Sequence, residues 1–208
     1  MNLIRRGWAI VKENWQAYVI INAVYYGLVA VFMVFAAFNQ SLQVMLVKSV
    51  GAGFTSGLFA FVGKTYGGRQ VLAAMAITLV INLFLGTVLE ITLPSLVVPF
   101  SGMVMGVVRA ALWGLLLSPA YPPLRMLMIP HSLTLILEGQ GYILGLLAVY
   151  VQGRAFLQPG SVGVEGHWAG YIEGLKRTGW LYSLVVLLLL VAAIYEALEV
   201  IFLAPLFR

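Results

Sequence analysis

Residues 71–118 read VLAAMAITLVINLFLGTVLEITLPSLVVPFSGMVMGVVRAALWGLLLS, an almost uninterrupted apolar run with only two charged side chains. The run is about twice the ~20 residues that one transmembrane helix needs. Proline, which interrupts helices, occurs in it at Pro94 and Pro99. The stretch therefore predicts a tight hairpin of two membrane helices, residues 71–93 and 100–118, with the turn near LPSLVVP.

The composition of the whole chain favours the same class of protein. Of its 208 residues, 62% are hydrophobic and 9% are charged, whereas soluble domains carry about 25% charged residues. The mean hydropathy is +1.00. The stretches between span-length apolar runs are at most about thirty residues long, too short for a soluble domain. We expect an all-α integral membrane protein with a single membrane domain over residues 1–208.

Three further apolar stretches reach the length of a bilayer span. The first, residues 17–38, is uncharged and would be about 33 Å long as a helix. The second begins at Pro130, because proline suits the first turn of a helix, and the third is the most apolar stretch of the chain as far as Glu196. With the hairpin they predict about five transmembrane helices, within a range of four to six, at residues 17–38, 71–93, 100–118, 130–151 and 181–203.

Two segments have the pattern of helices that lie in the headgroup layer. In residues 3–16, apolar residues recur at spacings of four, three and four and include two tryptophans, which favour membrane interfaces. A helix packed on the protein's own membrane domain is equally compatible with this pattern. In residues 165–180 an aromatic and apolar stripe lies beside a glycine stripe. Residues 39–70, with three basic residues and the run SVGAGFTSG, predict a surface or re-entrant segment.

Small residues recur at every fourth position of the predicted helix 100–118. They are Gly102, Gly106, Ala110 and Gly114. Such a stripe lets the backbone of another helix approach closely. We therefore expect a helix-packing surface here, and in an assembly this surface would hold subunits together.

Six ionisable residues lie in the predicted membrane helices, with one asparagine as a neutral polar companion. They are Asn82, Glu90, Arg109, His131, Glu138, Glu196 and Glu199. A charge at the centre of a bilayer costs about 3 kcal/mol on insertion scales, so such groups pair with each other or face the interior of a bundle. Arg109 lies in the middle of its helix and needs a carboxylate partner, for which Glu90, Glu138 and Glu196 are candidates. These residues predict an intramembrane polar network or an ion pathway.

The spacing of these residues bears on whether they bind an ion. Glu196 and Glu199 are three residues apart and share a helix face. His131 and Glu138 are seven apart, about 10 Å along a helix, too far to ligate one metal ion. A cation or proton site built from Glu196, Glu199 and either Glu138 or His131 is the sharper hypothesis, and a structural network with Arg109 is the alternative. No closed metal-ligand set is evident, so no metal site is predicted.

Motifs for enzymatic chemistry are missing from the sequence. The chain has no cysteine or aspartate, and neither a GxSxG, a Walker nor a GxGxxG motif precedes a suitable element. We expect no enzyme, no catalytic residue and no cofactor. The net charge of +5 lies mostly between the apolar runs, which favours contact with the lipid bilayer and no nucleic-acid partner.

Four short motifs occur in order between residues 71 and 205. They are Asn82 with Gly86, FSGMVMG at 100–106, the pair Pro130-His131, and AAIYEALEVIFLAP at 192–205. This set resembles the stage II sporulation protein M family of small polytopic membrane proteins. Pro130, His131 and Glu196 match that family's pattern. The acid that the family usually carries four residues after the histidine is absent, since Leu135 stands there and the acid appears at Glu138.

The resemblance implies a membrane platform that works with partner proteins, as the family's namesake does with peptidoglycan-degrading proteins, or a transporter component. We therefore expect a multi-pass protein of a prokaryotic inner or plasma membrane. Its first predicted function is a non-enzymatic assembly platform, as a homo-oligomer or with a partner membrane protein. The alternative is a channel or transporter with a Glu/His/Arg pathway inside the helix bundle.

Overall fold

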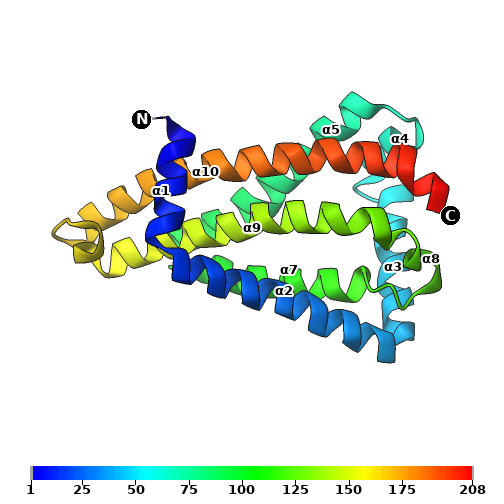
Figure 1. Cartoon of the computed structure of the whole chain (residues 1–208), viewed down its shortest axis with the longest axis horizontal. Helices are drawn as coiled ribbons and strands as arrows, with labels where there is room; N and C mark the ends of the chain where they lie inside the picture. Colours follow the sequence, from blue (N-terminus) through cyan, green and yellow to red (C-terminus); the bar gives the residue numbers. More distant parts are fainter. Residues whose placement is uncertain (1, 208) are drawn as a thin grey trace.

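The computed structural model describes residues 2–207, and there the fold is helical, with no strand (Figure 1). Four helices are long and apolar enough to cross a membrane: Trp15–Phe38, Val71–Val97, Met128–Leu157 and His167–Phe207. A bent pair of shorter helices adds a fifth crossing if the two count as one. The all-helical fold agrees with the sequence-based prediction, and four or five candidate crossings lie within its range. The predicted span 100–118 is not among them, because it forms only the shorter apolar helix Ser101–Leu116.

The helices follow one another through short connections. In chain order they are α1 (Leu3–Glu13), α2 (Trp15–Phe38), α3 (Gln40–Thr55), α4 (Ala60–Gly67), α5 (Val71–Val80), η1 (Ile81–Thr92), α6 (Leu93–Val97), α7 (Ser101–Leu116), α8 (Pro122–Arg125), α9 (Met128–Leu157), η2 (Pro159–Val162), α10 (His167–Leu198), η3 (Glu199–Leu203) and η4 (Ala204–Phe207). Of these, η1 and η3 have π-helical geometry, and η2 and η4 are 3₁₀ turns.

Helix α9 forms the centre of the bundle. Figure 1 shows it running between α10 on one side and α2 with α7 on the other. Its residues 141–149 are all buried, and Tyr142, Ile143 and Leu147 are fully enclosed. The facing side of α10 contributes Leu181 and Leu189, which are also fully enclosed. The central position of α9 explains why it carries buried polar residues as well as apolar ones.

The apolar run 71–118 folds as two connected helices. α5, η1 and α6 continue one another as far as Val97, and α7 starts at Ser101. The chain reverses at Phe100, a non-glycine residue with a left-handed φ of 67°. Pro94 does not end the first helix, because it occupies the first turn of α6, where its missing N–H is tolerated. The helix therefore ends later than the predicted residue 93.

The segment 39–70 forms a pair of helices bent by 79°. α3 and α4 meet at a break of four residues, and α4 then leads into α5. The Gln43 side chain of α3 donates a 2.7 Å hydrogen bond to the carbonyl oxygen of Ser118, which ties α3 to the end of α7. The bend gives this segment the form of a broken span or a re-entrant loop.

The segment 165–180, predicted as a separate interfacial helix, is instead the first half of α10. Helix α10 runs without a break from His167 to Leu198. Gly170 and Gly174 do not interrupt it, because both pack against the backbone of α9, where a Cβ would meet Ala155 and Gln152. The glycine stripe is thus a site of close packing between the two longest helices.

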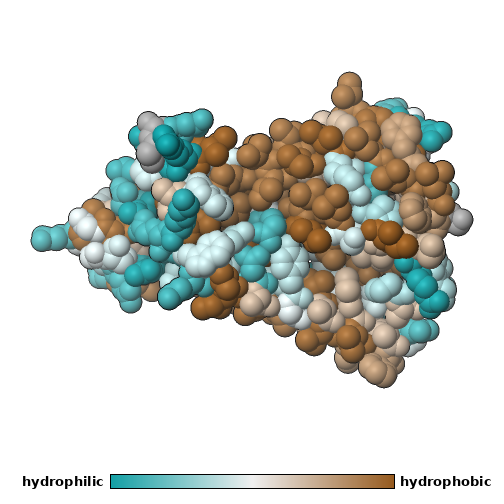
Figure 2. All heavy atoms as spheres, viewed as in Figure 1, coloured by the Kyte–Doolittle hydropathy of each residue, from teal (hydrophilic) through white to brown (hydrophobic). Residues whose placement is uncertain are grey.

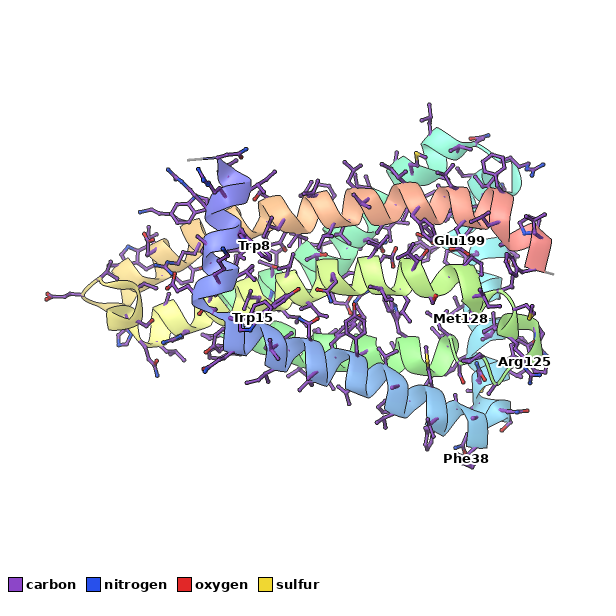
Figure 3. The ribbon with its side chains drawn as sticks, viewed as in Figure 1. Trp8, Trp15, Phe38, Arg125, Met128 and Glu199 are labelled. Carbon is purple, nitrogen blue, oxygen red and sulfur yellow. The ribbon has the colours of Figure 1, made fainter. Side chains whose placement is uncertain are left out.

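Helix α1 packs on α10, as in the second of the two predicted alternatives. Gly7 leaves no room for a side chain, since a Cβ there would lie 2.6 Å from the carbonyl oxygen of Trp180. Trp8 of α1 and Trp15, the first residue of α2, remain exposed (Figure 3). Hydrophilic side chains gather at this end of the molecule, while apolar side chains cover much of the remainder of the same face (Figure 2).

The small-residue stripe of α7 is occupied by other helices of the same chain. A Cβ on Gly102 would collide with the carbonyl oxygen of Ile91, and one on Gly106 with the side chain of Leu146. At Gly114 it would meet the backbone of Val29 in α2. Ala110 is fully buried. This stripe is therefore used for packing inside the chain, and a contact between subunits would need another surface.

Candidate functional site

The polar residues of three helices meet in the middle of the bundle. Asn82 lies in η1, Glu138 in α9 and Glu196 in α10. The amide nitrogen of Asn82 donates to Glu138 Oε1, and its amide oxygen accepts a 2.8 Å hydrogen bond from the Tyr142 hydroxyl. Because Tyr142 fixes the orientation of the amide, the NH₂ group of Asn82 points to the Glu138 carboxylate.

Two cavities adjoin this cluster. The first has a volume of about 320 Å³ and is lined by polar and aromatic side chains that include Tyr66, Thr78, Asn82, Arg109 and Tyr142. The second, of about 180 Å³, is lined by His131, Thr134, Leu116, Leu117 and Leu135. Three residues line both cavities: Trp113, Glu138 and Glu196. The two carboxylates therefore lie where the cavities adjoin.

Arg109 finds its partner in Glu90. The Arg109 guanidinium forms an ion pair with the Glu90 carboxylate, and both side chains are largely shielded from solvent. The guanidinium carbon also lies 4.3 Å from the centre of the Tyr142 ring, within the range of a cation–π contact. Of the three predicted partners of Arg109, only Glu90 is thus in direct contact, and its carboxylate compensates the charge that Arg109 brings to the first cavity.

His131 and Glu199 form a second pair at one end of α9. His131 Nδ1 lies 2.9 Å from Glu199 Oε2, and the Thr134 hydroxyl donates a 3.0 Å hydrogen bond to the same oxygen. Figure 3 shows Glu199 near the end of α10, in the same region as the start of α9 marked by Met128. Glu199 is therefore held by α9 and does not line the cavities with Glu196, although the two share a helix face.

The ion pairs leave the two central carboxylates without a cation. Within residues 2–207, the acids in ion pairs are Glu13, Glu90, Glu173 and Glu199. Glu138 and Glu196 form none there, and Glu138 is only 7% exposed. No group of three His, Asp or Glu in this part of the chain is arranged to hold a metal ion. Two carboxylates, an amide and nearby hydroxyls suit a proton or a monovalent cation.

Several lining residues were not singled out from the sequence. Thr78, Trp113 and Tyr142 each lie four residues from a polar residue that was, namely Asn82, Arg109 and Glu138. Residues four apart share a helix face, so this spacing could have identified all three. Tyr66 gives no such signal. It reaches the cavity from α4, where its hydroxyl lies 2.7 Å from Thr78 Oγ1.

Three of the residues that carry the family resemblance line these cavities: Asn82, His131 and Glu196. Their positions connect the motifs to one region of the bundle. The resemblance itself stays a prediction from short motifs. No family model, curated protein or solved structure matches the chain.

Proposed function

We propose that the protein is a multi-pass membrane protein that conducts or transports a proton or a small monovalent cation through the site at Glu138 and Glu196. The observation that carries the proposal is that these two carboxylates line the same two cavities and have no ion-pair partner within residues 2–207. Two like charges inside the bundle repel each other and lack the full solvation of bulk water. A bound cation or proton would relieve both costs.

The depth of the site in the bundle supports this function. Glu138 lies ten residues after the start of α9, about 15 Å along the helix at 1.5 Å per residue. If the four long helices cross a prokaryotic inner or plasma membrane, the pair lies well inside the hydrocarbon layer, which is about 30 Å thick. Ionisable residues at such depth are rare and usually belong to substrate or proton pathways.

Both cavities extend from the carboxylate pair towards one end of the bundle, where α3, α4 and the start of α9 lie (Figure 1). One reaches towards Tyr66 and Phe54 of the bent α3–α4 segment, and the other towards His131 at the start of α9. Trp113 lines both cavities, so its indole contributes to the boundary beside the carboxylates. An ion that exchanges between the cavities would therefore pass the carboxylate pair and this indole.

Flux through a Glu196→Gln variant tests the proposal. Purified protein in proteoliposomes would be assayed with pH-sensitive and potassium- or sodium-sensitive dyes. We expect flux to fall to the leak of empty vesicles. Glutamine keeps the shape of the side chain, but its neutral amide can neither take up a proton nor compensate the charge of a bound cation. Glu165→Gln is the matched control, since Glu165 is exposed and forms no ion pair within residues 2–207. Unchanged flux in Glu196→Gln would refute the assignment.

A second candidate function is an assembly platform, as the family resemblance implies. Its support is the bent α3–α4 segment, which exposes large apolar side chains outside the four long spans: Met45, Val50, Phe54, Leu58 and Phe61. Native mass spectrometry of gently extracted protein separates the two functions. A stable second protein would favour the platform, and a homo-oligomer without other proteins would favour the self-contained pathway.

A further inference from the structure

A polar pocket lies at the opposite end of the molecule from the His131–Glu199 pair. It has a volume of about 230 Å³ and lies where α1 ends and α2 begins, against the last third of α9. Its lining includes Lys12, Trp15, Gln16, Tyr150 and Arg154. The proposed ion site uses none of these residues.

The pocket carries uncompensated positive charge. Lys12 and Arg154 both line it, and in the part of the chain that the structure describes neither forms an ion pair. The one acid in the lining, Glu13, is held by Arg177, whose Nη1 lies 2.8 and 3.0 Å from its two carboxylate oxygens. Two cations thus face the pocket while its carboxylate is already neutralised.

The backbone adds to this preference for an anion. Asn14 precedes α2, but its side chain gives the helix no capping bond. Its amide nitrogen donates instead to the Ile10 carbonyl oxygen of α1 at 3.0 Å. The first turn of α2, which includes Trp15 and Gln16, borders the pocket. Uncapped N–H groups at a helix start attract anions, and they act here in the same direction as the two cationic side chains.

The surroundings indicate where the anion comes from. Trp15 is 53% exposed beside the pocket, and tryptophan is enriched at the level of lipid headgroups. Figure 2 shows hydrophilic side chains around this end of the bundle. Within the next two turns of α2 after the pocket, Val19, Ile20 and Val24 are exposed, and they form a surface that suits acyl chains. A lipid whose headgroup filled the pocket would lay its chains along this surface.

We propose that this pocket binds the phosphate of an anionic glycerophospholipid, held by Lys12 and Arg154. The shared chemistry is a phosphate ester, which free phosphate could imitate. The exposed apolar face of α2 next to the pocket favours a lipid over free phosphate, because it offers a surface for acyl chains. The proposal does not depend on the ion site, because the pocket and the carboxylate pair share no residue.

Lipid binding to the full chain in a neutral detergent tests the proposal. Short-chain phosphatidylglycerol would be titrated and bound lipid counted by native mass spectrometry, with short-chain phosphatidylcholine as the zwitterionic reference. We expect Lys12→Gln/Arg154→Gln to bind phosphatidylglycerol about 30-fold more weakly, since each basic residue near a membrane surface contributes about fivefold. Lys48→Gln/Arg125→Gln, which removes the same charge from exposed positions on α3 and α8, should bind like the unmodified protein.

Two further measurements keep the result unambiguous. Lys12→Gln alone changes an exposed side chain and should fold normally, with about a fivefold loss. Equal phosphatidylglycerol binding in this variant and in the unmodified chain would overturn the proposal. Inorganic phosphate is the soluble probe. Displacement of the lipid by inorganic phosphate at similar concentration would also overturn it, because a free anion would then be the ligand.

Discussion

Glu138 and Gln140 lie two residues apart on α9, and each is the centre of a polar cluster. Around Gln140, the Tyr18 hydroxyl donates to its amide oxygen at 2.6 Å, and its amide nitrogen donates to Asn22 and Tyr26 at 2.7 and 3.2 Å. This cluster is uncharged, and both polar atoms of Gln140 have partners. The cluster around Glu138 is charged and borders two cavities.

The difference between the two clusters shows how a structural polar network can be told apart from an ion-binding site. The Gln140 cluster joins α9 to α2 and gives both polar atoms of its central side chain a partner. Satisfied networks of this kind fix the positions of helices. The Glu138 cluster keeps two carboxylates that form no ion pair within residues 2–207, and it has space beside them. We therefore expect substitutions in the two clusters to affect different properties.

The largest effect is expected from Glu138→Gln, which removes one of the two carboxylates of the charged cluster. Flux in proteoliposomes should fall by about 100-fold, the factor that corresponds to about 2.7 kcal/mol of lost charge stabilisation. The melting temperature should not fall, because removing an unpaired buried charge does not cost stability. A variant with normal flux would make the Glu138 cluster structural as well.

An intermediate effect is expected from Glu90→Gln, which leaves Arg109 without its ion-pair partner. The variant should lose about 2 kcal/mol of unfolding free energy in detergent, since an unpaired, partly buried guanidinium is costly. Chemical denaturation followed by circular dichroism measures this loss. Equal stability of this variant and the exposed Glu165→Gln control would mean that Arg109 has other compensation.

The smallest effect is expected from Gln140→Leu. It removes hydrogen bonds to Tyr18 and Asn22 and should cost about 1 kcal/mol of stability, the usual net value of such bonds. Flux should stay unchanged, because no cavity residue is altered. Loss of flux in this variant, with the fold intact, would remove the distinction between the two clusters.

The sequence predicted the helical class and most polar residues of the Glu138 cluster. It predicted less well which of the polar residues pair with one another. The hairpin in 71–118 follows from local features, the apolar length and the prolines. The partner of Arg109 does not follow from local features, because the choice of Glu90 among the three candidates depends on how η1 packs beside α7. The continuity of α10 was also missed, since Gly170 and Gly174 weaken a helix locally and are compensated only by close packing on α9.

The π-helical geometry of η1 could not be predicted from the sequence. Its twelve residues, INLFLGTVLEIT, are mostly apolar and would suit an ordinary α-helix. A π-turn widens the helix by one residue, and the Thr87 hydroxyl bonds to the carbonyl oxygen of Asn82, five residues earlier, at 2.8 Å. This geometry depends on the neighbouring helices, and it sets the orientations of Asn82 and Glu90.

The shortness of α7 has a consequence for the membrane itself. Its 16 residues extend about 24 Å, less than the ~30 Å of a hydrocarbon layer. If α7 crossed a bilayer beside the four long helices, the loop that follows it would lie below the headgroups, where its backbone would need partners in the protein. Gln43 binds the carbonyl oxygen of Ser118, and the Ser118 hydroxyl binds that of Met33. The bilayer around this loop would then have to become thinner, so the protein should favour membranes of less than average thickness.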